Sequence, residues 1–210
     1  MKIADSRIRP TYELEAAEVQ LGFAPIAGVD EAGRGPWAGP VVAAAVILDP
    51  DRIPANIDDS KALDEESRAF LYNRIVKVAR VGVGIAELDR IDRENILGAT
   101  LWAMAQAVAA LGEAPKLVLI DGNKAPRLGV PTRTIIKGDA KCVSIAAASI
   151  IAKVTRDRLM MALARDFPGY GFERHKGYGT PEHQAAIEKL GVCALHRRSF
   201  KPVQLALGLL

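Results

Sequence analysis

The chain has 210 residues, half of them hydrophobic and a quarter charged, with a formal net charge of +3. This length and apolar content are sufficient for one globular domain with a sizeable core, and the small positive charge favours an anionic partner without requiring one. Two cysteines, Cys142 and Cys193, exclude a disulfide framework and stand at no zinc-ligand spacing, so both are expected to be reduced, buried thiols.

No segment matches a membrane span or a secretory signal. Residues 1–20 mix basic and acidic side chains and contain no apolar stretch. The longest apolar runs, 41–48 and 144–152, are far shorter than the ~20 residues that cross a bilayer. A cytoplasmic protein without membrane association is expected.

Strand and helix patterns alternate along the chain. Short runs rich in β-branched residues predict strands, and longer runs with a helical period predict helices. In chain order we expect strands at 26–30 and 40–48, a helix at 64–80, a strand at 81–85, a helix at 93–111, strands at 116–120 and 132–136, and a helix or helix pair at 140–167. This order predicts an α/β fold with one central mixed sheet flanked by helices. The basic, glycine-containing remainder from residue 168 on is expected to form a small helical addition.

Acidic residues stand where predicted strands end. Asp30 and Glu31 close the first strand, Asp121 follows the fourth, and Asp139 precedes the last long helix. Carboxylates crowded there would repel one another and raise their pKa values, unless a hard divalent cation such as Mg²⁺ or Mn²⁺ is bound by their oxygens. Three or four acids without histidine suit two metal ions ~3.5–4 Å apart, which activate water in phosphodiester hydrolysis. The predicted chemistry is therefore phosphoryl transfer to water.

A glycine-rich loop follows the first two acids directly. In Gly33-Arg34-Gly35 the missing side chains let a ligand approach the backbone, and Arg34 offers a planar cation to phosphate. Backbone groups beside a metal site could read a ribose 2′-hydroxyl, the local feature that distinguishes RNA from DNA.

Each pattern also has a simpler interpretation. An Asp-Glu pair alone is more often a solvated turn than a metal site, and Gly-Arg-Gly alone can be a plain tight turn. Asp121-Gly122-Asn123 matches a common type I′ turn. No single pattern decides between a turn and a site.

Taken together, the motifs resemble the ribonuclease HII family, in order and at compatible spacing from about residue 26 to about residue 203. They are GVDEAGRGPWAGP at 28–40, Asp59-Ser60-Lys61, Asp121-Gly122-Asn123, Lys137-Gly138-Asp139, SIAAASIIAKVTRD at 144–157, HKGYGT at 175–180 and HRRSF at 196–200. The resemblance implies a ribonuclease H-like fold with a five-stranded sheet in a single domain, 1–210. Its core would span about 24–168, and a C-terminal helical part, about 169–210, would help to grip a duplex.

The resemblance also implies an activity. The expected enzyme is an endonuclease that hydrolyses the RNA strand of RNA/DNA hybrids and cuts 5′ of ribonucleotides embedded in duplex DNA, leaving 5′-phosphate and 3′-hydroxyl ends. Its role would be removal of ribonucleotides and RNA primers. The corresponding catalytic and metal-binding acids are Asp30, Glu31, Asp121 and Asp139. One Mn²⁺ or Mg²⁺ is expected without substrate and two with it, in a monomer that needs no obligate protein partner.

Substrate contacts are implied in the same way. Gly33, Arg34 and Gly35 are similar to the loop that recognises the RNA–DNA junction through its backbone and the 2′-hydroxyl, and Tyr178 corresponds to a tyrosine that stacks on the next sugar. Basic residues are candidate phosphate contacts, each with a solvated surface charge as the alternative: Lys61, Lys153, His175, Lys176 and Arg197.

Some positions depart from the family or stand apart from its site. Ala62 follows Lys61 where the family often has a second lysine, so one phosphate contact is expected to be missing. Asp157 competes with Asp139 as a metal ligand, but an ion pair with Lys153 is sufficient to explain it. The tail, 204–210, lacks the paired aromatics of sliding-clamp peptides, and no clamp binding is predicted from it.

Three other functions fit parts of the pattern. A Rossmann-like nucleotide-binding enzyme needs GxGxxG opening a helix, and Pro36 and Pro40 after the loop argue against that. A non-catalytic hybrid-binding protein would tolerate loss of the carboxylates, all of which are present. A metal-dependent nuclease with a different substrate preference would have the same acids and would differ only in whether it needs a 2′-hydroxyl in the substrate.

Overall fold

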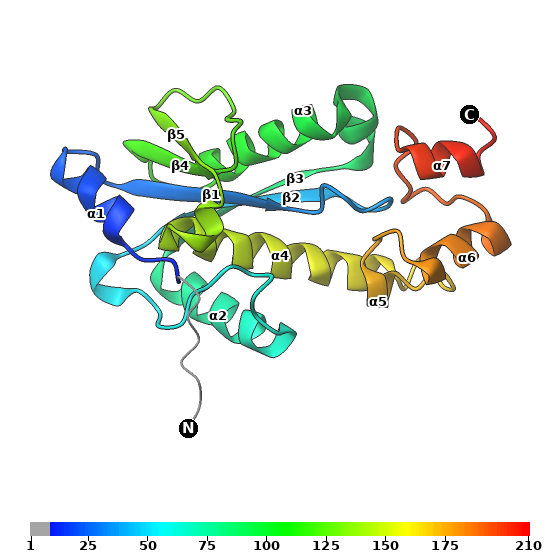
Figure 1. Ribbon diagram of the computed structural model, residues 1–210, viewed down its shortest axis with the longest axis horizontal. Helices are drawn as coiled ribbons and strands as arrows, with labels where there is room; N and C mark the ends of the chain where they lie inside the picture. The colour runs from blue at the N-terminus through cyan, green and yellow to red at the C-terminus, as the bar shows by residue number, and fades with distance from the viewer. Residues whose placement is uncertain (1–8) are drawn as a thin grey trace.

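A computed structural model describes residues 9–210, and a mixed five-stranded sheet forms its centre (Figure 1). The strands are β1 (Ile26–Ala32), β2 (Val41–Ile47), β3 (Arg80–Ala86), β4 (Leu117–Asp121) and β5 (Thr132–Ile135). They lie in the order β3-β2-β1-β4-β5. The pairs β1–β2 and β2–β3 are antiparallel, whereas β4 runs parallel to both β1 and β5. The mixed five-stranded sheet expected from the sequence is confirmed.

Helices cover both faces of the sheet and continue past one of its ends (Figure 1). They are α1 (Glu13–Gln20), α2 (Glu65–Val78), α3 (Leu88–Ala109), α4 (Val143–Leu163), α5 (Phe172–His175), α6 (Pro181–Leu190) and α7 (Lys201–Ala206), with 3-10 turns η1 (Pro50–Arg52) and η2 (Gly138–Ala140). Helix α3 covers one face, and α4 with α2 covers the other. No helix within 9–210 is long and apolar enough to cross a membrane.

The core lies on both sides of the sheet. Side chains alternate between the two faces of a strand, so on β2 Ala43 packs toward α3 and Ala44 packs toward α4. Helix α4 comes very close to β1, because a Cβ at Gly28 would lie 2.2 Å from the main-chain carbon of Ser144. The close contact fixes the start of α4, and with it η2, against the ends of β1 and β4.

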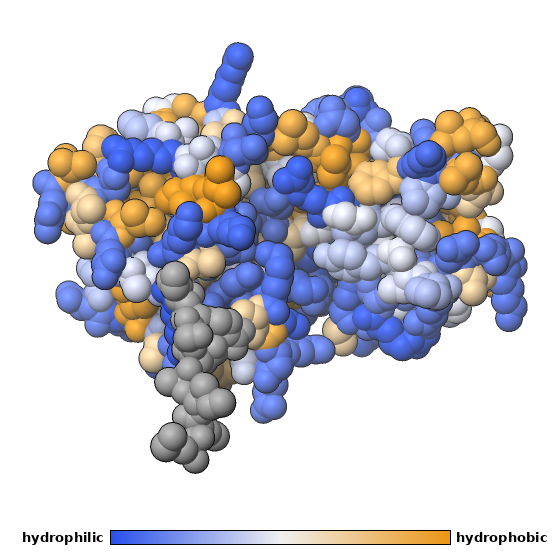
Figure 2. All heavy atoms as spheres, viewed as in Figure 1, coloured by the Kyte–Doolittle hydropathy of each residue, from blue (hydrophilic) through white to orange (hydrophobic). Residues whose placement is uncertain are grey.

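The C-terminal part follows α4 and consists of α5, α6 and α7, as expected for a small helical addition. Ala38, Met160 and Phe172 belong to one buried cluster, which joins this part to the end of α4 and to the loop between β1 and β2. Figure 2 shows apolar side chains gathered around α7 and the end of the chain. The exposed members there are Leu205, Leu207, Leu209 and Leu210.

Some features differ from the sequence expectations. Helix α1 was not predicted; Glu15 on it accepts a hydrogen bond from the main-chain N–H of Ser144 at 2.8 Å, at the start of α4. Helix α3 begins at Leu88, earlier than expected, and is interrupted at Asn95, which has φ 63° and ψ 170°. The expectation that residues 1–20 form no secretory signal rests partly on residues 1–8, which lie outside the described residues. Both cysteines are free, one buried and one half-buried.

Candidate metal centre and glycine loop

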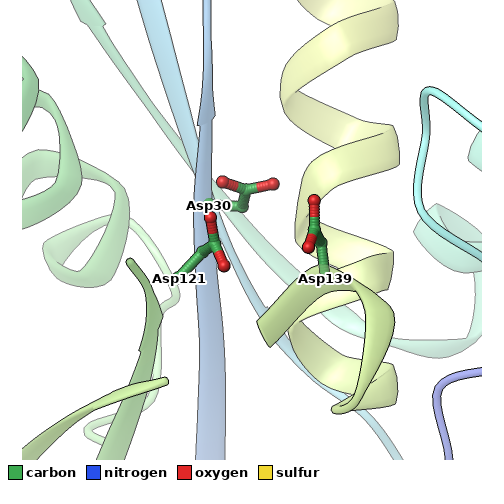
Figure 3. A group of neighbouring side chains, drawn as sticks. All are labelled: Asp30, Asp121 and Asp139. Atoms are coloured by element: carbon green, nitrogen blue, oxygen red, sulfur yellow. The ribbon is translucent and has the colours of Figure 1, made fainter. Parts of the chain in front are cut away.

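Three aspartates from separate elements converge at one place in the sheet (Figure 3). Asp30 lies on β1, Asp121 is the last residue of β4, and Asp139 lies in η2. One carboxylate oxygen of each lies within 4.8 Å of those of the other two. Val29 pairs with Ile120 in the parallel β1–β4 ladder, so the residues that follow them, Asp30 and Asp121, come side by side.

The cluster is electrostatically unfavourable for the chain alone. Asp30 is only 4% exposed, and burial raises its pKa well above the usual range, with repulsion from Glu31 and Asp121 adding to the effect. Burial also raises the pKa of Asp121, and the nearby Asp139 raises it further. Crowded carboxylate oxygens of this kind fit a hard divalent cation, whose binding would offset the repulsion. The donor set suits Mg²⁺ or Mn²⁺ rather than zinc.

Hydrogen bonds orient the carboxylates of Asp30 and Asp139. The main-chain N–H of Glu31 donates to Asp30 Oδ1 at 2.7 Å. Lys61 Nζ donates to Asp139 Oδ2 at 3.0 Å. Burial alone would lower the pKa of Lys61, but its bond to Asp139 outweighs this and raises the pKa. Lys61 therefore carries a positive charge beside the acids.

Glu31, the fourth predicted acid, lies next to the cluster rather than in it. Among the residues that the structure describes, the group of mutually close acids contains the three aspartates without Glu31. Its Oε1 instead accepts a hydrogen bond from Arg34 Nη1 at 3.2 Å. Burial raises the pKa of Glu31, and the bond to Arg34 opposes this rise. Glu31 thus connects the aspartates to the glycine loop.

Gly33 and Gly35 are glycines for different reasons. Gly33 has φ +95°, and a Cβ there would lie 2.0 Å from Arg156 Nε, so both conformation and packing require glycine. At Gly35 the φ angle is not in the left-handed region, and a Cβ would meet only Tyr178 Cε1, at 3.9 Å. Packing within residues 9–210 therefore does not require glycine at 35, and the backbone there is open to a ligand.

Tyr178 faces this opening. Its side chain is 42% exposed, and Lys153 Nζ and Arg156 Cζ lie 6.0 and 5.8 Å from the centre of its ring. The main chain of the loop is held firmly, because the Tyr178 N–H donates to the carbonyl of His175 at 2.9 Å. The structure therefore presents an aromatic ring beside an open glycine backbone, with Lys153 and the buried Arg156 next to the ring.

Two predicted phosphate contacts are wrong. Arg197 is fully buried, and its guanidinium donates to main-chain carbonyls of the glycine loop. His175 is 9% exposed, and its ring nitrogens pair with the carbonyl of Tyr170 and the N–H of Gly177. Neither side chain can reach a phosphate from its position. Both were assigned by residue type, which does not reveal burial by segments distant in the sequence.

The remaining basic candidates and Asp157 lie nearer the surface. Lys61 has an exposed side chain, and Lys153 and Lys176 are half-buried. Asp157 Oδ1 accepts from Lys153 Nζ at 2.8 Å, the ion pair expected in place of a role in the metal site.

Arg156, to which the sequence motifs assigned no role, is buried beside the glycine loop. Its Nε donates to the carbonyl of Pro40 at 3.0 Å and its Nη2 to that of Ala38 at 3.1 Å. One signal was present in the sequence, because Arg156 lies four residues from both Ala152 and Met160 and thus on the apolar stripe of a helix. Both of these neighbours are fully buried.

Comparisons with known proteins agree with this geometry. A family model described as ribonuclease HII matches residues 27–203. A ribonuclease HII of Azorhizobium caulinodans is 58% identical over 194 residues, which cover 92% of this chain and 75% of that protein.

Two solved structures are also similar. The ribonuclease H2 of Pyrococcus horikoshii OT3 superimposes with a TM-score of 0.74 at 25% identity, over 86% of this chain and 96% of that one. A chain from the PCNA:RNase HII complex of Archaeoglobus fulgidus gives a TM-score of 0.72 at 28% identity, over 84% and 95%.

Proposed function

The chain belongs to the ribonuclease HII family and is a ribonuclease H, a nuclease that hydrolyses phosphodiesters, and from this premise we propose its substrates and its site. The ribonuclease H-like fold expected from the sequence is confirmed by the solved relatives. The proposed reactions are hydrolysis of the RNA strand in RNA/DNA hybrids and cleavage 5′ of a ribonucleotide in duplex DNA, leaving 5′-phosphate and 3′-hydroxyl ends. They would serve ribonucleotide and RNA primer removal. The observation that carries the proposal is the convergence of Asp30, Asp121 and Asp139 beside an open glycine backbone.

The proposed metal ligands are Asp30, Asp121 and Asp139, with Glu31 as the adjacent fourth acid. When bound, Mg²⁺ or Mn²⁺ would polarise the scissile phosphate and lower the pKa of a water, with one ion expected in the free enzyme and two with substrate. The aspartates hold oxygen donors in place before the substrate arrives, because Asp30 and Asp139 are already fixed by hydrogen bonds. Lys61 places a cation at the edge of the site, where it would contact a phosphate.

The proposed reading of the ribose uses the loop and the tyrosine. The backbone at Gly35 is open, so a sugar can approach its N–H, and the missing Cβ leaves room for a 2′-hydroxyl. Arg34, with a half-exposed side chain, would contact a phosphate. The ring of Tyr178 would pack on the next sugar. In this proposal the catalytic core spans about 24–168, and the C-terminal part, about 169–210, grips the duplex.

The proposal includes location and partners. We place the enzyme in the cytoplasm as a monomer that needs no obligate protein partner. The described structure contains no membrane-spanning helix. The complex with PCNA belongs to the Archaeoglobus fulgidus protein. For this chain, the absence of clamp binding through 204–210 stays a prediction.

Cleavage of matched duplexes tests the proposed function. The substrates are a labelled RNA/DNA hybrid, a DNA duplex with one ribonucleotide and the same duplex in DNA alone, each with Mg²⁺, Mn²⁺ or EDTA. We expect metal-dependent cleavage of the first two, lost in Asp121→Asn and kept in Asp89→Asn, an exposed aspartate of α3. Binding of the hybrid without cleavage under any metal would favour the hybrid-binding alternative. Equal cleavage of all-DNA duplex would favour a nuclease of broader preference.

A further inference from the structure

Two buried arginines lie behind the glycine loop. Arg197 is 0% exposed and Arg156 is 1% exposed. Burial, together with repulsion from Arg156, lowers the pKa of Arg197 to about 9, so its guanidinium is still protonated at neutral pH. Within residues 9–210 no carboxylate lies at salt-bridge distance from either guanidinium. Buried cations without a counter-ion need other polar partners, so these two depend on the groups around them.

The loop between β1 and β2 supplies partners for Arg197. Nη2 donates to the carbonyl of Gly33 at 2.6 Å, Nη1 to that of Arg34 at 3.0 Å, and Nε to that of Gly39 at 2.9 Å. The planar guanidinium thus binds both ends of the loop at once. A lysine could not do so, because its ammonium is a single point of charge without a fork of fixed donors.

These bonds fix the direction of the peptide planes. In a trans peptide the carbonyl and the N–H of the next residue point to opposite sides. Because the carbonyls of Gly33 and Arg34 point to Arg197, the N–H groups of Arg34 and Gly35 point away from it. Neither N–H has an acceptor among the described residues. Two free donors are therefore held on the side away from the buried arginine.

Arg156 supports the same loop from α4. Its bonds to Ala38 and Pro40 hold the segment that follows the glycines. Its side chain also fills the space in which a Cβ of Gly33 would lie, so the buried arginine leaves no room for a side chain at this position. The loop is thus fixed both at Gly33 and just before β2.

The turn that carries Arg197 is itself anchored. The N–H of Arg197 donates to the carbonyl of Trp37 at 2.8 Å. Asp92, in the first part of α3, accepts from the N–H groups of Arg198 and Ser199 at 3.1 and 2.9 Å. A surface carboxylate therefore holds the turn from one side, and the glycine loop receives the guanidinium on the other.

We propose that Arg197 is a positioning residue for ribose discrimination. By binding the carbonyls of Gly33 and Arg34, its guanidinium aims the N–H groups of Arg34 and Gly35 at the sugar, and Asp92 stabilises the turn that delivers it. Arg197 touches neither substrate nor metal in this arrangement. The inference rests on the proposed function of the glycine loop as the reader of the ribose.

The test is the preference in binding between two duplexes that differ in one hydroxyl. Fluorescence anisotropy gives Kd for a DNA duplex with one ribonucleotide and for the same duplex in DNA alone, in the Asp121→Asn background, which prevents cleavage. In Arg197→Lys we expect the ratio of the two Kd values to fall about tenfold, with the affinity for all-DNA duplex within about twofold of the parent. The matched control is Arg198→Lys, at the exposed neighbouring arginine, which should keep the ratio of the parent.

The ratio separates positioning from a general loss of structure. A variant that only unfolds loses active protein for both duplexes equally, which leaves the ratio unchanged. An unchanged ratio in folded Arg197→Lys would overturn the inference. If Arg197→Lys does not fold, Asp92→Asn replaces it, with an expected fall of about threefold, and an unchanged ratio there would overturn the inference as well. If the parent protein shows no preference for the ribonucleotide, the proposed function of the loop fails first.

Discussion

The main-chain N–H of Gly138 donates to Asp121 Oδ1 at 2.7 Å, and this bond joins the end of β4 to the turn that carries Asp139. The Asp121 carboxylate is thereby held against the backbone of the residue that precedes Asp139, which keeps the two acids close together. This arrangement holds carboxylates that repel one another close together, so we expect the clustered aspartates to lower the stability of the metal-free protein.

Asp30→Asn should stabilise the metal-free protein. The folded pKa of Asp30 is raised above the unfolded value, so the folded state binds more protons and loses stability as pH rises through that range. At pH 7 the amide removes this cost, and we expect Tm in EDTA to rise by about 2–4 °C.

The matched prediction concerns Mn²⁺. Added Mn²⁺ should raise the Tm of the wild type and have little effect on Asp30→Asn, because only the folded wild type binds the ion well. Thermal scans in EDTA and in excess Mn²⁺ measure both effects. A lower Tm for the variant in EDTA, or no response of the wild type to Mn²⁺, would refute this view of the cluster.

Gly33→Ala and Gly35→Ala should fail in different ways. At Gly33 the new Cβ would strain a positive φ and collide with Arg156, so we expect a loss of about 1–3 kcal/mol in unfolding free energy. At Gly35 the methyl group has room, so unfolding should change by less than about 0.5 kcal/mol. Gly35→Ala should nevertheless cut the single-ribonucleotide duplex at least about tenfold more slowly. Urea melts measure the change in stability of both variants, and cleavage rates measure the defect of Gly35→Ala. Normal cleavage by folded Gly35→Ala would contradict the proposed approach of the sugar to this backbone.

Tyr178→Ala should weaken substrate binding, and Tyr178→Phe should not. The ring is exposed and its hydroxyl has no hydrogen-bond partner in the described structure, so the flat face is the feature offered to a ligand. By analogy with stacking on aromatic side chains, loss of the ring should cost about 1–2 kcal/mol, or roughly 5- to 30-fold in kcat/KM. Steady-state kinetics of the three proteins test this. An equal loss in the phenylalanine variant would assign the effect to the hydroxyl instead.

Acid should loosen the support of the Tyr178 loop. His183 Nε2 lies 3.1 Å from His196 Nε2, so one of the two nitrogens must accept the hydrogen bond, and the ring that carries this nitrogen must be neutral. Burial lowers the pKa of His183 to about 4, and it also lowers that of His196. The rings of the unfolded chain take up protons near pH 6.5, whereas those of the folded protein do not. The contribution of the two histidines to the free energy of unfolding is therefore complete above pH 6.5 and is lost as the pH falls toward 4.

The measurement is Tm against pH in EDTA. From pH 7 to pH 5 the Tm of wild type should fall by about 3 °C relative to that of His183→Asn, because the variant lacks one of the two linked histidines. The raised pKa values of the clustered acids affect both proteins alike and cancel in this comparison. Equal slopes in the two proteins would show that the acid effect has another source.

The strands could be predicted from the sequence because their signal is local. The run that forms β2 is fully buried and rich in valine and alanine, and the predicted range differs from the observed one by single residues at its ends. The positions of Asp30 and Asp121 followed from the same signal, since each directly follows the apolar run of its strand, although β1 itself continues to Ala32. Their mutual distance came only from the parallel pairing of β1 with β4.

Other parts could not be predicted, because they depend on distant contacts. Helix α1 has no apolar stripe of helical period and is held by Glu15 against the start of α4. The break in α3 lies at Asn95, whose side chain accepts hydrogen bonds from two following N–H groups and so starts the next helical segment. Arg197 and His175 resembled surface cations by type, and only the folded C-terminal part encloses them.

The most direct test of the central claim is the position of the cut. A duplex with one ribonucleotide, labelled at the 5′ end of that strand, is incubated with wild type and Mn²⁺ and analysed at single-nucleotide resolution. We predict one product that ends in a 3′-hydroxyl immediately 5′ of the ribonucleotide, and none from the matched all-DNA duplex. Cleavage on the 3′ side of the ribonucleotide, or equal cleavage of the all-DNA duplex, would contradict the claim that the loop beside the three aspartates reads the ribose.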